Sequence, residues 1–144
     1  VDGSGRVGMR VCPDNPFNGL ADDNPQDTFD YLLGRAAGLE LAYLHVIRMP
    51  AGRVDNVALG RRYFPDRLIV NDSYDREEAE QVIAAGDAAA VAFGRAFIAN
   101  PDLPARFLTG SPLARFDSAT LYTPGERGYT DYPTLPDPDC AQRP

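Results

Sequence analysis

Three polar clusters stand where apolar segments of the chain end. Arg10 closes the first segment, residues 71–73 (Asn-Asp-Ser) follow the third, and Gly94 and Arg95 follow the fourth. Glycine lets a ligand approach the backbone closely, and an arginine offers a fork of donors that matches phosphate oxygens. The spacing alone leaves two interpretations open: an anion site, or arginines that form ordinary surface ion pairs.

Composition limits the other chemistry. All 14 basic residues are arginines, so mechanisms that need a lysine, such as Schiff-base formation, are excluded. His45 is the only histidine, and Cys12 lies far from Cys140, so we expect no metal site, and a disulfide between the two cysteines stays open. The net charge of −7 argues against nucleic acid and anionic membranes as partners. Without an apolar run of about 18 residues, we expect a soluble, cytoplasmic protein with no membrane contact.

Apolar periodicity predicts elements that alternate between strand and helix. Asn24-Pro25 is a typical helix start, and the nearly continuous apolar run over 41–47 predicts a strand covered on both faces. Residues 79, 82 and 83 are expected to form the buried stripe of a later helix. The expected strands cover 5–12, 41–47, 68–70 and 89–93, and the expected helices cover 25–37, 57–62, 75–86 and a short stretch from Pro101.

This alternation predicts an α/β fold with parallel strands joined by right-handed crossovers. Four such units suit a chain of 144 residues either as a small open sheet or as half of a (β/α)8 barrel. In both architectures, ligands bind at the carboxyl ends of the strands, where the three polar clusters lie.

Several segments resemble the C-terminal half of the old yellow enzyme family, the FMN-dependent ene-reductases. The resemblance covers roughly residues 5–135 and is most specific over 93–103 and in the tyrosine-containing tail. It implies strands five to eight of a (β/α)8 TIM barrel, with a half-barrel domain over 1–135 and a disordered or extended tail over 136–144. The segments that carry it are 6–10 (RVGMR), 41–46 (LAYLHV), 68–71 (LIVN), 92–103 (AFGRAFIANPDL) and 128–134 (GYTDYPT).

The resemblance also implies roles for individual residues. Arg10 matches the arginine that faces the N1/O2 edge of the flavin. Gly94 and Arg95 match the pair that holds the FMN phosphate. Leu121 and Tyr122 match an aromatic pair near the dimethylbenzene edge of the flavin and the mouth of the substrate site, although leucine replaces the usual phenylalanine.

One matched segment departs more strongly from the family. Asn71, Asp72 and Ser73 match a segment that usually carries glycines beside the phosphate. Like charges about 4 Å apart repel by about 4 kcal/mol at an effective dielectric constant near 20, so an inward-facing Asp72 would weaken FMN binding. A structural pair between Arg10 and Asp72 is a second interpretation of both residues.

The resemblance covers only half of a barrel, so we expect a second set of strands to complete it. Family members carry their His/Asn pair for the substrate carbonyl and their tyrosine proton donor in the other half. Four strands of a barrel have two open edges and a bare inner face. We expect a two-fold homodimer to close the barrel; a complementary half-barrel subunit, or the loops over 13–24 and 48–65 folding across the sheet, are the alternatives.

The sequence is therefore consistent with two functions. The first is an FMN-binding oxidoreductase that uses NAD(P)H to reduce an activated alkene. The second is a flavin-free derivative that binds a small hydrophobic molecule and catalyses a cyclisation or isomerisation. The candidate catalytic residues are Arg10, Tyr122 and Asp72, of which Arg10 or Tyr122 would donate hydrogen bonds and Asp72 would act as base or charge partner in the flavin-free protein.

Overall fold

The computed structural model describes residues 3–136. The chain divides into two compact units, Val1–Ala92 and Phe93–Pro144, which are treated separately below. The predicted tail beyond residue 136 lies outside the described residues, as does Cys140 and with it the disulfide that the sequence left open.

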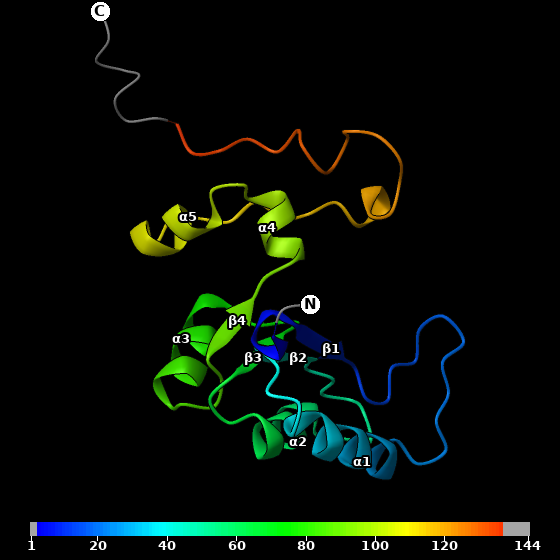
Figure 1. Ribbon diagram of the computed structural model, residues 1–144. Helices are drawn as coiled ribbons and strands as arrows, with labels where there is room; N and C mark the ends of the chain where they lie inside the picture. Colours follow the sequence, from blue (N-terminus) through cyan, green and yellow to red (C-terminus); the bar gives the residue numbers. More distant parts are fainter. Residues whose placement is uncertain (1–2, 137–144) are drawn as a thin grey trace, which may run out of the picture. The chain divides into compact units, whose positions relative to one another are not determined.

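The first unit is a parallel four-stranded sheet with helices between its strands, as predicted (Figure 1). The strands lie in the order β1-β2-β3-β4, so each strand pairs with the next one along the chain. This is the order of consecutive strands in a barrel. The elements are η1 (Ser4–Arg6), β1 (Gly8–Val11), α1 (Pro25–Ala37), β2 (Tyr43–Ile47), α2 (Asn56–Tyr63), β3 (Leu68–Asn71), α3 (Arg76–Ala84) and β4 (Ala90–Ala92).

Helix α1 begins and ends where the sequence predicts. The Asn24 side chain accepts a hydrogen bond from the backbone N–H of Asp27, and Pro25 occupies the first helical position. Proline is favoured there because its missing N–H would have no partner within the helix. Gly38 caps the other end. These signals are local, so they do not depend on the rest of the fold.

The core lies between the sheet and helices α1 and α2. Leu44 and Val46 of β2 are fully buried, as are Leu68 and Val70 of β3. The intervening side chains point to the opposite face and are only partly buried. The prediction that residues 41–47 are covered on both faces is therefore wrong, because helices cover one face of this sheet and the other is the inner face of a barrel segment.

Gly8 and Tyr43 form a tight contact on this inner face. The two residues are direct partners in the register of β1 and β2. The ring of Tyr43 lies so close to the Gly8 backbone that a side-chain carbon at position 8 would overlap it. A side chain at position 8 would require the Tyr43 ring, which is 41% exposed, to move aside.

Two other expectations for the first unit need correction. The first strand is shorter than predicted because Ser4–Arg6 forms a 3-10 helix before it. In α3, Ala79 is buried, but Ile83 is 49% exposed instead of belonging to a buried stripe. Periodicity identifies an apolar face, and no element within the described part of this unit covers the Ile83 end of that face.

The second unit contains α4 (Arg95–Ala99), α5 (Leu103–Thr109) and η2 (Ser118–Thr120). The predicted helix near Pro101 corresponds to α5, whereas α4 was not predicted. Helix α4 is only five residues long, and Gly94 at its start provides no side-chain cap. A helix of this length has neither a full apolar period nor a start signal.

Buried polar side chains hold the second unit together. The Asn100 side chain is completely buried; its amide donates to the carbonyls of Ala96 (2.9 Å) and Ala114 (3.1 Å) and accepts from the Ala114 N–H (2.8 Å). These bonds fasten the segment after α5 to the end of α4.

Arg106 provides a second connection within this unit. Its side chain is 8% exposed and donates to the Asp102 carboxylate (2.7 Å) and to the carbonyls of Pro112 (2.9 Å) and Pro133 (3.1 Å). The N–H of Leu135 and then Arg106 itself hold the pKa of Asp102 below its ordinary value. One guanidinium thus joins α5 to two separate parts of the chain that follows it, at Pro112 and at Pro133.

Across residues 3–136, none of the helices combines the length and the apolar character that a membrane span requires.

Candidate functional site

Arg10 and Asn71 meet at the carboxyl end of the sheet. Arg10 is the third residue of β1, and Asn71 is the last residue of β3. The Arg10 guanidinium, which is solvent-exposed, donates to the Asn71 side-chain oxygen over 3.4 Å. Strand β2 lies between them, so the arginine side chain crosses a neighbouring strand to reach its partner. This places a positively charged donor on the inner face, as the sequence predicted.

His45 lies directly beside Arg10 in the strand register. Its Nε2 atom is buried and finds no hydrogen-bond partner among the described residues. Burial lowers the pKa of His45 below its ordinary value of 6.5, the Arg10 charge lowers it further, and a hydrogen bond with Asn71 acts in the opposite direction. The imidazole is therefore neutral at pH 7 and borders the guanidinium without repelling it.

This lowered pKa makes stability depend on pH. The unfolded chain binds a proton at His45 more readily than the folded chain, so stability rises with pH through the range just below 6.5, with a slope of no more than one proton. Because His45 is the only histidine, urea denaturation between about pH 5 and 7 isolates it from the carboxylates, which titrate at lower pH. We expect His45→Gln to abolish the slope; an unchanged slope in that variant would contradict this assignment.

The turn after β3 has an unusual backbone. Asp72 (φ +83°) and Ser73 (φ +59°) both adopt the left-handed region, which glycine enters without steric cost. This conformation is one that the glycines implied by the family resemblance at these positions would adopt without strain. Here the conformation is kept with two side chains, one of which carries a negative charge.

Arg48 holds this turn from the end of β2. Its Nε donates to the Asp72 carbonyl (3.2 Å), and its Nη2 donates to the Ser73 carbonyl. The guanidinium also pairs with Glu78 of α3 (3.2 Å) and lies 3.8 Å from the centre of the Tyr74 ring. Sequence reasoning missed Arg48; its only signal was a cation directly after a strand.

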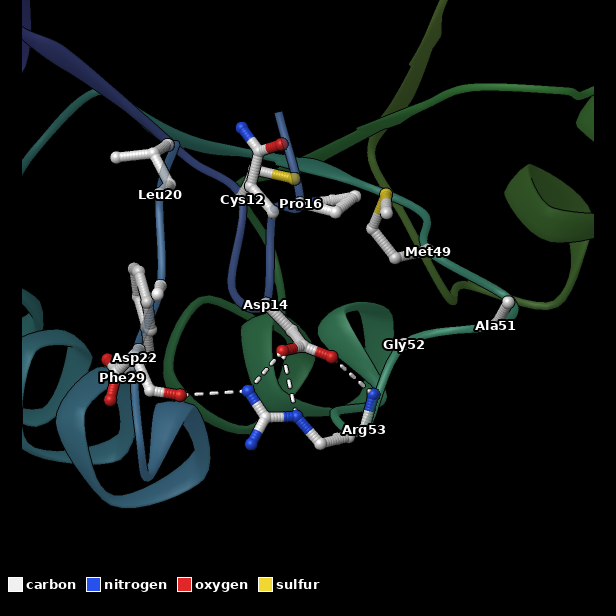
Figure 2. Close-up of a pocket in the computed structure, with 12 residues that line it drawn as sticks. Cys12, Asp14, Pro16, Leu20, Asp22, Phe29, Met49, Ala51, Gly52 and Arg53 are labelled. Atoms are coloured by element: carbon white, nitrogen blue, oxygen red, sulfur yellow. Dashed lines mark hydrogen bonds and ion pairs between the residues drawn. The ribbon is translucent and has the colours of Figure 1, made fainter. Parts of the chain in front are cut away.

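A cavity of about 510 Å³ opens between the loops that follow β1 and β2 (Figure 2). Its walls are largely apolar, with contributions from Leu20, Phe29 and Met49. The volume lies within the usual range of small-molecule sites. The other lining residues are Cys12, Asp14, Asn15, Pro16, Ala21, Asp22, Ala51, Gly52 and Arg53.

Two of the three charged groups that line this cavity, Asp14 and Arg53, are bonded to each other. Asp14 accepts hydrogen bonds from the Arg53 backbone N–H (2.6 Å), Nε (3.0 Å) and Nη2 (2.6 Å), and Arg53 also donates to the Asp22 carbonyl (2.8 Å). These bonds from Arg53 lower the pKa of Asp14. Burial raises the pKa of the Cys12 thiol. The cavity therefore offers apolar surface more than free charge, and the sequence analysis did not anticipate it.

In the second unit, Gly94 and Arg95 form the start of α4. Gly94 has open space where a side chain would begin. The Arg95 guanidinium lies 5.6 Å from the centre of the Phe116 ring. The first N–H groups of a helix have no partners within that helix, so backbone and side-chain donors are close together here.

Leu121 and Tyr122 follow η2 in the same unit. Leu121 is partly buried, whereas the Tyr122 side chain is 96% exposed and its backbone has φ +63°. The Tyr122 N–H donates to the Tyr129 hydroxyl (2.5 Å), which holds the turn. The catalytic role suggested for Tyr122 thus rests on a side chain that projects into solvent.

Comparison with known proteins identifies relatives. No family model matches the chain. It is 41% identical over 137 residues to a probable flavin mononucleotide-dependent alkene reductase of Leishmania infantum, covering 92% of this chain and 37% of that protein. It is 37% identical over 142 residues to a putative 12-oxophytodienoate reductase of Oryza sativa subsp. japonica, with the same two coverages.

Solved structures agree with this result. The old yellow enzyme of Trypanosoma cruzi matches with a TM-score of 0.84 and 42% identity over 92% of this chain and 36% of its own. Morphinone reductase matches with a TM-score of 0.81 and 39% identity over 99% of this chain and 39% of its own. The chain thus spans well under half the length of the relatives it matches, and the expected half-barrel fold is confirmed.

Proposed function

Because this chain is homologous to the C-terminal part of the old yellow enzymes, we propose that it forms the FMN-binding side of an alkene reductase. With a second set of strands, it would reduce an activated alkene at the expense of NAD(P)H. The observation that carries the proposal is the exposed Arg10 guanidinium, held by Asn71 at the carboxyl end of a parallel sheet whose relatives are FMN-dependent.

Each unit, taken by itself, carries groups that suit a planar anionic cofactor. Arg10 offers a cation, Gly94 leaves space for close backbone approach, and Arg95 adds a guanidinium suited to a phosphate. Asp72 is the one group of the set whose charge opposes an anion. FMN, when bound, supplies hydride transfer to the alkene.

In this proposal, the role of the chain's own residues is to bind the flavin and to orient its ring. Arg10 would hold the electron-rich edge of the flavin ring, and Asn71 fixes the direction of its guanidinium. Neutral His45 adds no positive charge beside Arg10. Leu121 and Tyr122 would border the outer edge of the ring. No substrate-protonating group is assigned to this chain. A second set of strands from an identical copy would complete only the flavin site, and alkene reduction would need a complementary subunit that brings a proton donor.

A second copy of the chain is the proposed source of those strands. Strands β1 and β4 are the edges of the sheet in the described part of the chain, so each has one side available for pairing. In a two-fold dimer, β1 of one copy would pair with β4 of the other, twice, giving eight strands. A separate half-barrel subunit is the alternative source.

The test is a titration of the purified chain with FMN, followed by flavin fluorescence and the visible spectrum, with the mass of the complex measured by light scattering. We expect saturable binding by a dimer, and reduction of the bound flavin by NADPH in the absence of oxygen. A colourless monomer that leaves FMN fluorescence unchanged would overturn both the cofactor and the dimer.

The largely apolar cavity favours a second candidate, a flavin-free protein that binds a small hydrophobic molecule. Asp14 and Arg53 of its lining are paired with each other, and the Asp22 carboxylate is the remaining charge, so an anionic ligand is disfavoured and an uncharged one suits the apolar walls. This function would be preferred if the chain binds no flavin but an uncharged environment-sensitive dye binds to it, and if Leu20→Asp in the cavity wall abolishes that binding.

A further inference from the structure

We propose that Arg53 determines the charge preference of the cavity between the loops that follow β1 and β2. By masking the Asp14 carboxylate, it makes this cavity a site for uncharged, largely apolar molecules and weakens the binding of cations there. None of the residues assigned to the flavin lines the cavity. The inference therefore rests on the second candidate function and is independent of FMN.

Arg53 reaches the loop after β1 at three positions. The Asp14 carboxylate accepts one backbone and two side-chain hydrogen bonds from it, at 2.6 Å, 3.0 Å and 2.6 Å. The guanidinium also donates to the carbonyls of Asp22 (2.8 Å) and Asp23 (3.4 Å). A single residue thus engages both carboxylate oxygens of Asp14, Oδ2 through its backbone N–H and Oδ1 through its guanidinium (Figure 2).

These contacts decide how much charge a ligand meets. The Asp14 side chain is 16% exposed, whereas that of Arg53 is 59% exposed. The hydrogen bonds from Arg53 hold the pKa of Asp14 below its ordinary value, so the carboxylate is charged at pH 7. Its charge is nevertheless opposed by the adjacent guanidinium, which lines the same cavity.

The charges of the lining predict the effect of removing Arg53. With Arg53 in place, the lining holds the carboxylates of Asp14 and Asp22 and one guanidinium, which leaves one excess negative charge. The other walls are largely apolar and favour an uncharged molecule by burial of apolar surface. Without Arg53, the same walls would present two carboxylates with no cation between them, and a cationic ligand would gain most.

The test compares two probes of nearly equal size, uncharged naphthylmethanol and naphthylmethylamine, which is cationic at pH 7. The chain contains no tryptophan, so naphthalene emission reports binding without interference from indole. We expect Arg53→Met to strengthen naphthylmethylamine binding about fivefold, the effect of about 1 kcal/mol between unit charges about 4 Å apart in water, and to change naphthylmethanol binding less than about twofold. Asp14→Asn should weaken naphthylmethylamine binding by a similar factor.

The opposite signs separate a role in charge from a role in loop structure. Both substitutions break contacts between the same two loops, so a purely structural pair would lose both probes in both variants. The double variant, with Asp14→Asn and Arg53→Met together, restores one excess negative charge to the lining. It should therefore return the ratio of the two affinities to that of the unaltered chain.

Arg61 and Asp87 provide the matched control, because they form an exposed ion pair and neither lines the cavity. Arg61→Met and Asp87→Asn change the net charge by the same amounts and should leave the ratio of the two affinities unchanged. Equal effects at the two pairs, or loss of both probes in both cavity variants, would overturn the role of Arg53 and leave the second candidate function intact.

The place of binding is checked by amide NMR. Naphthylmethanol should shift the signals of Ala21 and Gly52, which line the cavity. If neither probe binds the unaltered chain, or if binding leaves these two signals unshifted, the second candidate function fails and the role of Arg53 fails with it. Neither result bears on FMN binding, which the flavin titration measures separately.

Discussion

Replacing Arg106 with methionine is expected to lower the free energy of unfolding of the second unit by about 3 kcal/mol, the order of loss when one partner of a buried ion pair is removed. The methionine fills a similar volume but leaves Asp102 Oδ1 and the carbonyls of Pro112 and Pro133 without their donor, while the Leu135 N–H remains on Asp102 Oδ2. Urea denaturation, combined with hydrogen exchange of peptides from residues 93–136, measures the loss where it arises.

The control for this substitution lies in the same unit. Arg115 is exposed, so Arg115→Met removes an arginine without removing a buried connection. It should change stability by less than about 0.5 kcal/mol, as surface substitutions usually do. Equal stability of the two variants would show that the segment after α5 is held in place without Arg106.

Replacing Asp72 is expected to give the largest gain in FMN affinity. Asp72→Asn removes the negative charge and keeps a residue that tolerates the left-handed region. An increase is expected because a negative charge beside the phosphate is removed; about 4 kcal/mol is the upper limit for like charges about 4 Å apart at an effective dielectric constant near 20, and the contacts that Asp72 makes within the protein reduce it. Asp72→Gly should increase the affinity further, because it also removes the side chain from the turn. Titration with FMN at fixed ionic strength measures both effects.

Two comparisons make this prediction specific. Asp66→Asn neutralises an exposed acid in another loop, so it reports the effect of net charge alone. Riboflavin affinity should respond weakly to either Asp72 variant, because riboflavin lacks the phosphate. If Asp72→Asn and Asp66→Asn strengthen FMN binding equally, only the overall charge matters and the turn itself is not a phosphate site.

The sequence was sufficient where the determining interactions are local or repeat along the chain. Asn24 and Pro25 start α1 through their own backbone and side-chain chemistry. The alternation of strand and helix predicted parallel pairing in chain order and thus placed Arg10 and Asn71 at the same end of the sheet; their direct hydrogen bond was not predicted, since the partner suggested for Arg10 was Asp72. The family resemblance was confirmed by relatives at 41% and 37% identity.

What could not be predicted depends on loop conformation. The contact between Asp14 and Arg53 joins residues 39 positions apart, in two loops without periodicity. Arg48 reaches the carbonyls of Asp72 and Ser73 because both residues adopt the left-handed region. An Asp-Ser sequence does not predict that conformation. The exposure of Ile83 was missed for a related reason: periodicity describes a helix face but not its neighbours.

The contact between Gly8 and Tyr43 bears on how this sheet can change in evolution. A side chain at position 8 overlaps the tyrosine ring, so the two sites share one volume. Which residues are tolerated at position 8 then depends on the side chain at position 43, and the reverse. Homologous sequences with alanine or a larger residue at position 8 should carry either a smaller residue at position 43 or a tyrosine whose ring has turned away from position 8.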